Sequence, residues 1–337
     1  MEDTSSGPDR ILFRAPNWLG DAVMAAAAVE SVRSLLPRAH IGLAIKENIA
    51  GLGGLLPAVN QVHPLPPPGH GLNLALAQIS AQKYEKLILF PNSFRSAWEL
   101  WNSGIPLRAG YSGIIRSLLL THSVPRPAKH SMNQRDYFMA LAGSVFPGLT
   151  AEAPRLVIPQ DAMAKSYSLL PDDGRPLAGI GFGATYGAAK MWPAQRFAHL
   201  IDGLAPHARV VLLGAPSDGP VETRVMELSA SSPLSLVGRT DIPTLAAILK
   251  RLAVYITNDT GPMHLASALG APVVAIFGPT DPAETAPAGP MVQIIRRKAD
   301  CAPCWKRQCP IDHRCMTAIS VDEVGEAAMN FINRQRA

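Results

Sequence analysis

The chain has 337 residues, of which 47% are hydrophobic and 17% are charged, with four cysteines and a formal net charge of +5. This length favours two domains, and the composition excludes a disordered, collagen-like or disulfide-rich protein. The longest apolar run, residues 22–29, is much shorter than the roughly 20 residues that a membrane span needs. The first ten residues lack the basic and then apolar pattern of a signal peptide, so we expect a cytoplasmic location.

The first part of the chain alternates short β-branched or apolar runs with longer helical patterns. This alternation predicts a parallel sheet covered by helices. We expect strands at 11–14, 41–45, 61–64 and 87–90, and helices at 22–36, 47–56, 70–82 and 131–146.

The turn after the first strand, residues 15–21, has the sequence APNWLGD. It lacks the three spaced glycines of the dinucleotide-binding fingerprint, which disfavours a dehydrogenase. Asp21 fits an ordinary helix N-cap. It also fits a general base, because it follows a strand at the edge where parallel sheets bind ligands. The residues alone leave both interpretations open.

Basic side chains concentrate between residues 91 and 135, which hold six Lys and Arg against one acidic residue. An acidic lipid or sugar acceptor fits this charge, and a solvated basic face is the alternative. Nucleic acid is disfavoured because the segment has no recognisable nucleic-acid motif and no aromatic stacking platform is expected in it.

Proline-rich composition follows at residues 147–176 and predicts a linker with one short helix at 162–170. A C-terminal helix is expected to pack back on the first domain. The predicted organisation is a first domain at 1–155, a linker at 156–172, a second domain at 173–320 and the C-terminal helix at 321–337.

The strand and helix alternation then restarts. A glycine-rich loop, GATYGAAKMWP at 183–193, follows the first of the new strands. It is not a Walker A loop, because Met191 follows Lys190 and the glycine spacing is wrong. Lys190 can stabilise negative charge beside backbone N–H groups, or it is simply a solvent-exposed lysine. We expect strands at 177–182, 210–213, 234–236, 254–257 and 273–277, and helices at 196–204, 222–230, 242–251 and 263–269.

Residues 256–282 read as strand, tight turn, helix and second strand. The N-terminus of a helix in this position points unpaired N–H groups at the crevice, which suits an anion. Asp259 or Thr260 can cap the helix, and Gly261 allows a ligand to approach the backbone closely. The alternative is an ordinary capped helix in which His264 is packed inside.

The four cysteines, Cys301, Cys304, Cys309 and Cys315, lie within fifteen residues. In a reducing compartment they are free thiols or metal ligands rather than disulfides. The first pair has the spacing of a metal knuckle, and His313 is a fifth candidate ligand, which makes a structural zinc a candidate. The loop is shorter than ordinary zinc ribbons.

These motifs together resemble glycosyltransferase family 9, the bacterial heptosyltransferases. The resemblance rests on DTGPMH at 259–264, GPTDP at 278–282, the loop at 183–193, PNSFRSA at 91–97 and the cysteine pattern, and it is strongest to the heptosyltransferase II subfamily. It implies an α/β GT-B fold, in which two Rossmann-like domains face each other across a cleft.

The resemblance also implies an inverting glycosyltransferase that moves heptose from ADP-heptose to the anionic inner core of lipopolysaccharide. Asp21 would be the catalytic base, and Lys190 would stabilise the leaving diphosphate. The implied donor-binding residues are Thr185, Lys190, Asp218, Asp259, Thr260, Gly261 and His264. The implied acceptor-binding residues are Asn17, Trp18, Asn92, Ser93, Arg95 and Arg116.

No cofactor or divalent ion is expected in catalysis, and no nucleic-acid partner. Peripheral contact with the cytoplasmic face of the inner membrane is expected at most. The alternatives are a type I or type III heptosyltransferase, another GT-B enzyme such as a nucleotide-sugar epimerase, or a non-catalytic sugar-nucleotide binding protein.

Overall fold

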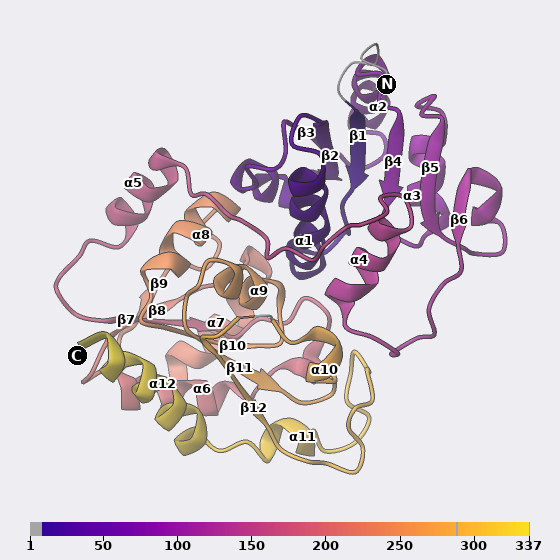
Figure 1. Cartoon of the computed structure of the whole chain (residues 1–337). Helices are drawn as coiled ribbons and strands as arrows, with labels where there is room; N and C mark the ends of the chain where they lie inside the picture. Colours follow the sequence, from indigo (N-terminus) through magenta and orange to yellow (C-terminus); the bar gives the residue numbers. More distant parts are fainter. Residues whose placement is uncertain (1–8, 288, 337) are drawn as a thin grey trace. The chain divides into compact units, whose positions relative to one another are not determined.

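The computed structural model describes residues 9–287 and 289–336 (Figure 1). The expectation that the first ten residues are not a signal peptide falls mostly on residues 1–8, which lie outside the described part. The chain divides into two compact units, Met1–Val157 and Ile158–Ala337. Among the described helices, none is both long and apolar enough to cross a bilayer.

Within residues 9–157, parallel strands form a sheet in the order β3-β2-β1-β4-β5-β6. Helices α1 and α4 pack against each other (Figure 1), while α2 and α3 contribute to a separate apolar cluster with Leu12 and Leu87. The elements are β1 (Arg10–Arg14), α1 (Leu19–Leu35), β2 (His40–Lys46), η1 (Glu47–Leu55), β3 (Gln61–Leu65), α2 (Leu72–Ala81), β4 (Lys86–Leu89), α3 (Phe94–Trp101), β5 (Leu107–Tyr111), η2 (Arg116–Leu119), β6 (His122–Val124) and α4 (Gln134–Gly143).

Three local expectations for this unit need correction. The segment expected as a helix at 47–56 is the 3-10 helix η1, because its sequence carries three glycines, which weaken an α-helix. Strands β5 and β6 were not predicted, since one contains Arg108 and Gly110 and the other has three residues. Helix α1 begins at Leu19, so Trp18 is the N-cap and Asp21 lies in the first turn.

The second unit repeats the plan with parallel strands in the order β12-β11-β10-β7-β8-β9. Strand β12 was not predicted. The elements are α5 (Gln160–Leu169), β7 (Leu177–Gly181), η3 (Ala188–Lys190), α6 (Ala194–Leu204), β8 (Arg209–Leu212), η4 (Pro216–Asp218), α7 (Gly219–Leu228), β9 (Leu234–Ser235), α8 (Ile242–Arg251), β10 (Val254–Asn258), α9 (Gly261–Ala268), β11 (Val273–Phe277), α10 (Pro282–Thr285), β12 (Val292–Arg296), α11 (Arg314–Thr317) and α12 (Val321–Arg336).

Both sheets reverse their strand order at one point, between β1 and β4 in the first unit and between β10 and β7 in the second. The loops that follow these strands diverge at the carboxyl edge of the sheet, which is where open α/β sheets bind ligands. The fold class expected from the sequence, two Rossmann-like α/β domains, is therefore confirmed, and each domain has one such point.

Two expected segments pack within the second unit. The predicted linker, 156–172, contains α5, which packs on α8. Helix α12, which we expected to pack back on the first domain, contributes its buried side chains, including Val324 and Ile332, to the core of the second unit. The apolar face of α12 packs against this core, largely against α6.

This packing of α12 gives a stability prediction. Ile332→Ala removes a fully buried side chain from the second unit's core and should cost about 2–5 kcal/mol of unfolding free energy. The exposed neighbour Asn333 provides the control, because Asn333→Ala should change stability by less than about 0.5 kcal/mol. Urea unfolding followed by circular dichroism measures both, and equal stability of the two variants would contradict the packing.

Candidate active site

In the second unit, the side chain of Asn258 ties the end of β10 to the glycine-rich loop that follows β7. Its Nδ2 donates to the carbonyl of Phe182 at 2.9 Å, and its Oδ1 accepts from the backbone N–H of Trp192 at 3.0 Å. The amide is fully buried, so it satisfies backbone groups at both ends of the loop. The sequence analysis missed Asn258. An amide side chain at the last position of a buried strand is a signal for such a residue, because its polar groups need hydrogen-bond partners there.

Lys190 and Asp259, from these two loops, form a buried ion pair. Lys190 is 8% exposed, which excludes the solvent-exposed alternative. Asp259 also accepts a hydrogen bond from Thr280 Oγ1 at 2.7 Å, and the Lys190 ammonium lies 4.8 Å from the centre of the Tyr186 ring. The pair therefore fixes a positive charge at the point where the strand order reverses.

Helix α9 begins at the same place. Thr260 is its N-cap residue, but its side chain makes no capping hydrogen bond and lies 3.3 Å from the Thr257 hydroxyl. The Asp259 carboxylate is engaged by Lys190 and Thr280, so the expected side-chain cap is wrong for both candidates. The first turn, with Gly261, therefore presents backbone N–H groups that no side chain of the N-cap occupies.

His264 is buried on α9, one turn from Gly261. Burial is the main cause that lowers the pKa of His264 to about 4, and the nearby Lys190 charge adds to it while Asp259 opposes it. The imidazole is therefore neutral near pH 7 and offers one N–H donor beside the helix N-terminus.

The glycine-rich loop is fastened to the cysteine-containing segment. Ala189 N–H donates to the carbonyl of Arg307 at 3.0 Å, and the Tyr186 hydroxyl donates to the carbonyl of Trp305 at 2.6 Å. A Cβ on Gly187, whose φ is +155°, would collide with the Arg307 backbone. This contact explains why glycine stands there. Thr185 is exposed on the same loop.

Asp218 follows β8 and lies against the loop after β7. Its carboxylate accepts from the backbone N–H of Ala215 at 2.8 Å, and a Cβ on Gly183 would contact both of its oxygens. Burial raises the pKa of Asp218. The structure thus brings Asp218 beside the start of the loop that holds Thr185 and Lys190.

The four cysteines are free thiols in this structure. Within residues 9–287 and 289–336, no group of three or more His, Cys, Asp and Glu side chains is placed to hold a metal ion, so the candidate zinc has no support. His313, the fifth candidate ligand, instead lies 2.7 Å from the Ala189 carbonyl. Cys315 is buried, and burial is the main cause that raises its pKa to about 11.

In the first unit, the ends of β1 to β4 border a groove of about 410 Å³. Three expected acceptor-binding residues, Asn17, Ser93 and Arg95, line it. Arg14 and Lys46 line it as well, and the sequence analysis missed both. Each is the last residue of a parallel strand, a position from which a basic side chain can reach the carboxyl edge of the sheet.

Arg14 is nearly buried beside this groove. Its guanidinium donates to Asn17 Oδ1 at 2.9 Å and to the Ala15 carbonyl, while its Nε has no hydrogen-bond partner among the described residues. Burial lowers the pKa of Arg14 to about 10, with the Glu99 charge opposing the shift. Arg14 remains charged at neutral pH and has an unused donor.

Asp21 is three residues after the N-cap Trp18, in the first turn of α1, where a carboxylate interacts favourably with the helix dipole. The alternative that Asp21 is the N-cap is therefore wrong. Trp18 is half exposed.

Arg116 and Asn92 shape the loop after β4. Arg116 is 3% exposed, and its guanidinium donates to the Pro91 carbonyl at 2.8 Å and to the Tyr111 carbonyl. Asn92 donates to the Tyr137 hydroxyl at 2.9 Å. Ser93 caps α3 by accepting from the Ser96 N–H at 3.1 Å. Arg116 therefore stabilises this loop through its hydrogen bond to the Pro91 carbonyl.

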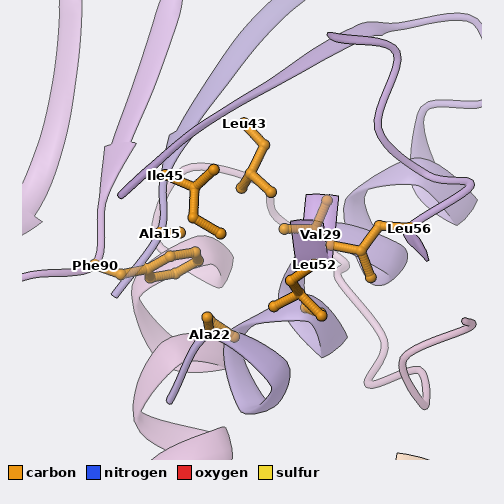
Figure 2. A pocket seen from close by; sticks show the side chains of 10 residues that line it. Ala15, Ala22, Val29, Leu43, Ile45, Leu52, Leu56 and Phe90 are labelled. Atoms are coloured by element: carbon orange, nitrogen blue, oxygen red, sulfur yellow. The ribbon is translucent and has the colours of Figure 1, made fainter. Parts of the chain in front are cut away.

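A second hollow in the first unit lies beneath α1 (Figure 2). Its volume is about 10 Å³, and only apolar side chains, such as Val29, Leu43, Ile45, Leu52 and Phe90, line it. A space of this size holds at most one water, and here a water would find no side-chain partner. The hollow is a packing gap and contributes no site.

Comparison with known proteins decides the family. The sequence model of glycosyltransferase family 9, the heptosyltransferases, matches residues 74–314. The chain belongs to glycosyltransferase family 9. It is 28% identical to the lipopolysaccharide heptosyltransferase 2 of Salmonella typhimurium over 309 residues, which cover 85% of this chain and 88% of that protein. The corresponding Escherichia coli protein is 28% identical over 307 residues, with the same coverage.

Solved structures agree with the fold of this family 9 enzyme. The Escherichia coli ADP-heptose lipopolysaccharide heptosyltransferase II superposes with a TM-score of 0.83 at 24% identity, covering 97% of this chain and all of that one. A family 9 glycosyltransferase from Veillonella parvula gives a TM-score of 0.84 at 22% identity, covering 97% and 98% of the two chains. These likenesses confirm the GT-B fold, and the family match confirms a glycosyltransferase.

The Lys190 and Asp259 pair predicts non-additive stability effects. Asp259→Asn leaves a buried ammonium without its counter-charge, and Lys190→Met leaves a buried carboxylate, so each should cost about 3–5 kcal/mol. The double variant removes both charges and should be more stable than the sum predicts by about 1–3 kcal/mol. Urea unfolding of the four proteins measures this coupling, and additive effects would show that the pair is not formed.

Proposed function

We propose that this glycosyltransferase transfers heptose from ADP-heptose to the inner core of lipopolysaccharide, as a heptosyltransferase of type II. The observation that carries the proposal is the convergence of Lys190 and the N-terminus of α9 at the point where the second sheet reverses its strand order. Such a combination of a fixed cation and unpaired N–H groups suits a diphosphate. The two relatives that match over 85% of this chain are lipopolysaccharide heptosyltransferases 2, and this supports heptose as the sugar and lipopolysaccharide as the acceptor.

The second unit binds the donor. The diphosphate lies against Lys190 and the first turn of α9, with Thr260 and Gly261 approaching it through their backbone. Thr185 reaches the diphosphate from the exposed part of its loop, and neutral His264 donates a hydrogen bond. Asp259 holds Lys190 in place. Asp218 accepts from the ribose, a role that suits a carboxylate beside the same loop.

The first unit binds the acceptor. The groove lined by Asn17, Ser93 and Arg95 collects cationic and hydrogen-bonding groups that fit a phosphorylated sugar. Arg14 strengthens this assignment, since it lines the groove and remains charged at neutral pH. Lys46 adds a second charge. Trp18 borders the acceptor from the start of α1, and Asn92 and Arg116 act by holding the loop that carries Ser93.

The chemistry is a single displacement with inversion. Asp21 accepts the proton of the acceptor hydroxyl while the hydroxyl oxygen forms a bond to the anomeric carbon of heptose. The bond between that carbon and the diphosphate oxygen breaks, and the electron pair leaves with ADP. Lys190 and the N–H groups of α9 stabilise the developing negative charge, which is why the proposal includes no metal ion or other cofactor. The cysteines have no catalytic role in it.

We also propose that the enzyme works in the cytoplasm, in peripheral contact with the inner membrane that holds its lipid-linked acceptor. No nucleic acid takes part. The basic residues between 91 and 135 serve the anionic acceptor and the surface that surrounds it.

Release of ADP from ADP-heptose tests the reaction, with a core carrying one heptose as acceptor and a core lacking heptose as the comparison. Release with the first core alone is expected. Release with the second core alone would move the assignment to a type I enzyme, and release with neither would overturn the donor or the acceptor. Excess EDTA should leave the rate unchanged.

The same assay tests Asp21. Asp21→Asn keeps the shape of the first turn but removes the base, so turnover should fall by about 10²- to 10⁴-fold while ADP binding is kept. Asp136→Asn is the matched control, because Asp136 occupies the same first-turn position three residues after the N-cap of α4. Near-normal turnover of Asp21→Asn would refute the role.

A further inference from the structure

Helix α3 exposes a row of aromatic side chains. Phe94, Trp98 and Trp101 recur at the spacing of one helix face, and their rings stack with centroids 5.9 Å and 5.5 Å apart. Trp98 is 50% exposed, and the other two are exposed to a similar degree. The sequence analysis did not identify this exposed aromatic row, and the i, i+4, i+7 spacing is the signal that could have found it.

The turn that packs against α3 is exposed and apolar as well. Element η2 contacts α3, and Leu118 on η2 is 81% exposed. Ile114 and Ile115, the two residues before η2, are exposed as well, and Ile114 is fully exposed. We call these six residues, Phe94, Trp98, Trp101, Ile114, Ile115 and Leu118, the α3–η2 surface.

Single exposed apolar side chains are ordinary, but six large ones on α3 and on the turn that contains η2 are not. The exposed side chains do not hold α3 on its own unit, because the helix packs into the core through Ala97 and Leu100. Each of these side chains leaves in water apolar area whose burial would be favourable. The surface therefore has the composition of a binding face.

The charges around the surface favour an anionic partner. Arg126 and Lys129 are exposed. Burial is the main cause that lowers the pKa of Arg116 on η2, and the charge of Arg126 adds to it. Glu99, the one acidic residue between 91 and 135, is paired with Arg95. A symmetric contact with a second copy would bring two such basic rims together. Single-stranded nucleic acid needs free ring faces, whereas these rings stack on one another.

Exposed tryptophan, isoleucine and leucine in one segment with exposed arginine and lysine is the composition that proteins place at a bilayer interface. We propose that the α3–η2 surface docks on an anionic lipid bilayer, with Trp98 and Leu118 inserting at headgroup depth and Arg126 and Lys129 contacting lipid phosphates.

Docking would also orient the acceptor groove. A neighbouring flank of α3 carries Arg95 and Glu99, which line that groove together with Ser93. The same short helix thus faces lipid on one side and the groove on another, which suits an acceptor sugar attached to a membrane lipid. This orientation rests on the proposed function, but lipid binding itself does not.

Vesicle flotation without donor or acceptor tests the proposal independently of catalysis. The wild-type protein should float with vesicles of phosphatidylethanolamine and phosphatidylglycerol and not with phosphatidylcholine alone. A W98E/L118E variant should bind the anionic vesicles at least tenfold more weakly. The control is L74E/I311E, which adds the same charges at two other apolar positions that are 66% and 57% exposed, and it should bind as wild type does.

An R126Q/K129Q variant should lose the preference for anionic over neutral vesicles, and higher salt should weaken binding of the wild type. Circular dichroism establishes that each variant is folded. The proposal is overturned if the wild type does not float with anionic vesicles, or if W98E/L118E floats as well as its control. It is equally overturned if W98E/L118E only converts a dimer to a monomer in sedimentation velocity, because the occupant is then a second copy.

Discussion

The buried ion pair of Lys190 and Asp259 is the interaction on which the second unit's site depends. It joins a loop after β7 to the turn after β10, two segments that are far apart in sequence but adjacent where the sheet reverses its order. Neither charge could be buried alone, since an unpaired ion in a protein interior costs several kcal/mol. The pair, together with the Asn258 amide and the Thr280 hydroxyl, holds an ammonium group beside the uncapped start of a helix.

The same topological constraint acts in both units. Parallel strands bring all their carboxyl ends to one edge, and a reversal of strand order separates the loops there. In the first unit the outcome is a groove with several basic groups, and in the second it is a buried ammonium group, that of Lys190, paired with Asp259 just before the N-terminus of α9. The division of labour that we propose, acceptor on one unit and donor on the other, follows from these different side chains on one shared plan.

Much of this was predictable from the sequence, because the strands of buried parallel sheets are continuous apolar runs and the loops after them carry recognisable motifs. The fold class and the grouping of Lys190 with Asp259 belong to this part. What the sequence could not predict depends on tertiary contacts. A basic residue such as Arg116 reads as a surface charge, and only packing shows that it is buried and donates to backbone carbonyls. The packing of α12 on α6 and the exposure of Trp98 are likewise decided by which faces other elements cover.

The central claim is that the diphosphate of the donor lies at Lys190 and the first turn of α9. Hydrogen exchange with mass spectrometry, in the presence and absence of ADP, tests it most directly. The account predicts slower exchange within residues 183–190 and 259–264 when ADP is added, and loss of this protection in Lys190→Met. Protection by ADP at other segments alone, with both of these unchanged, would contradict the account.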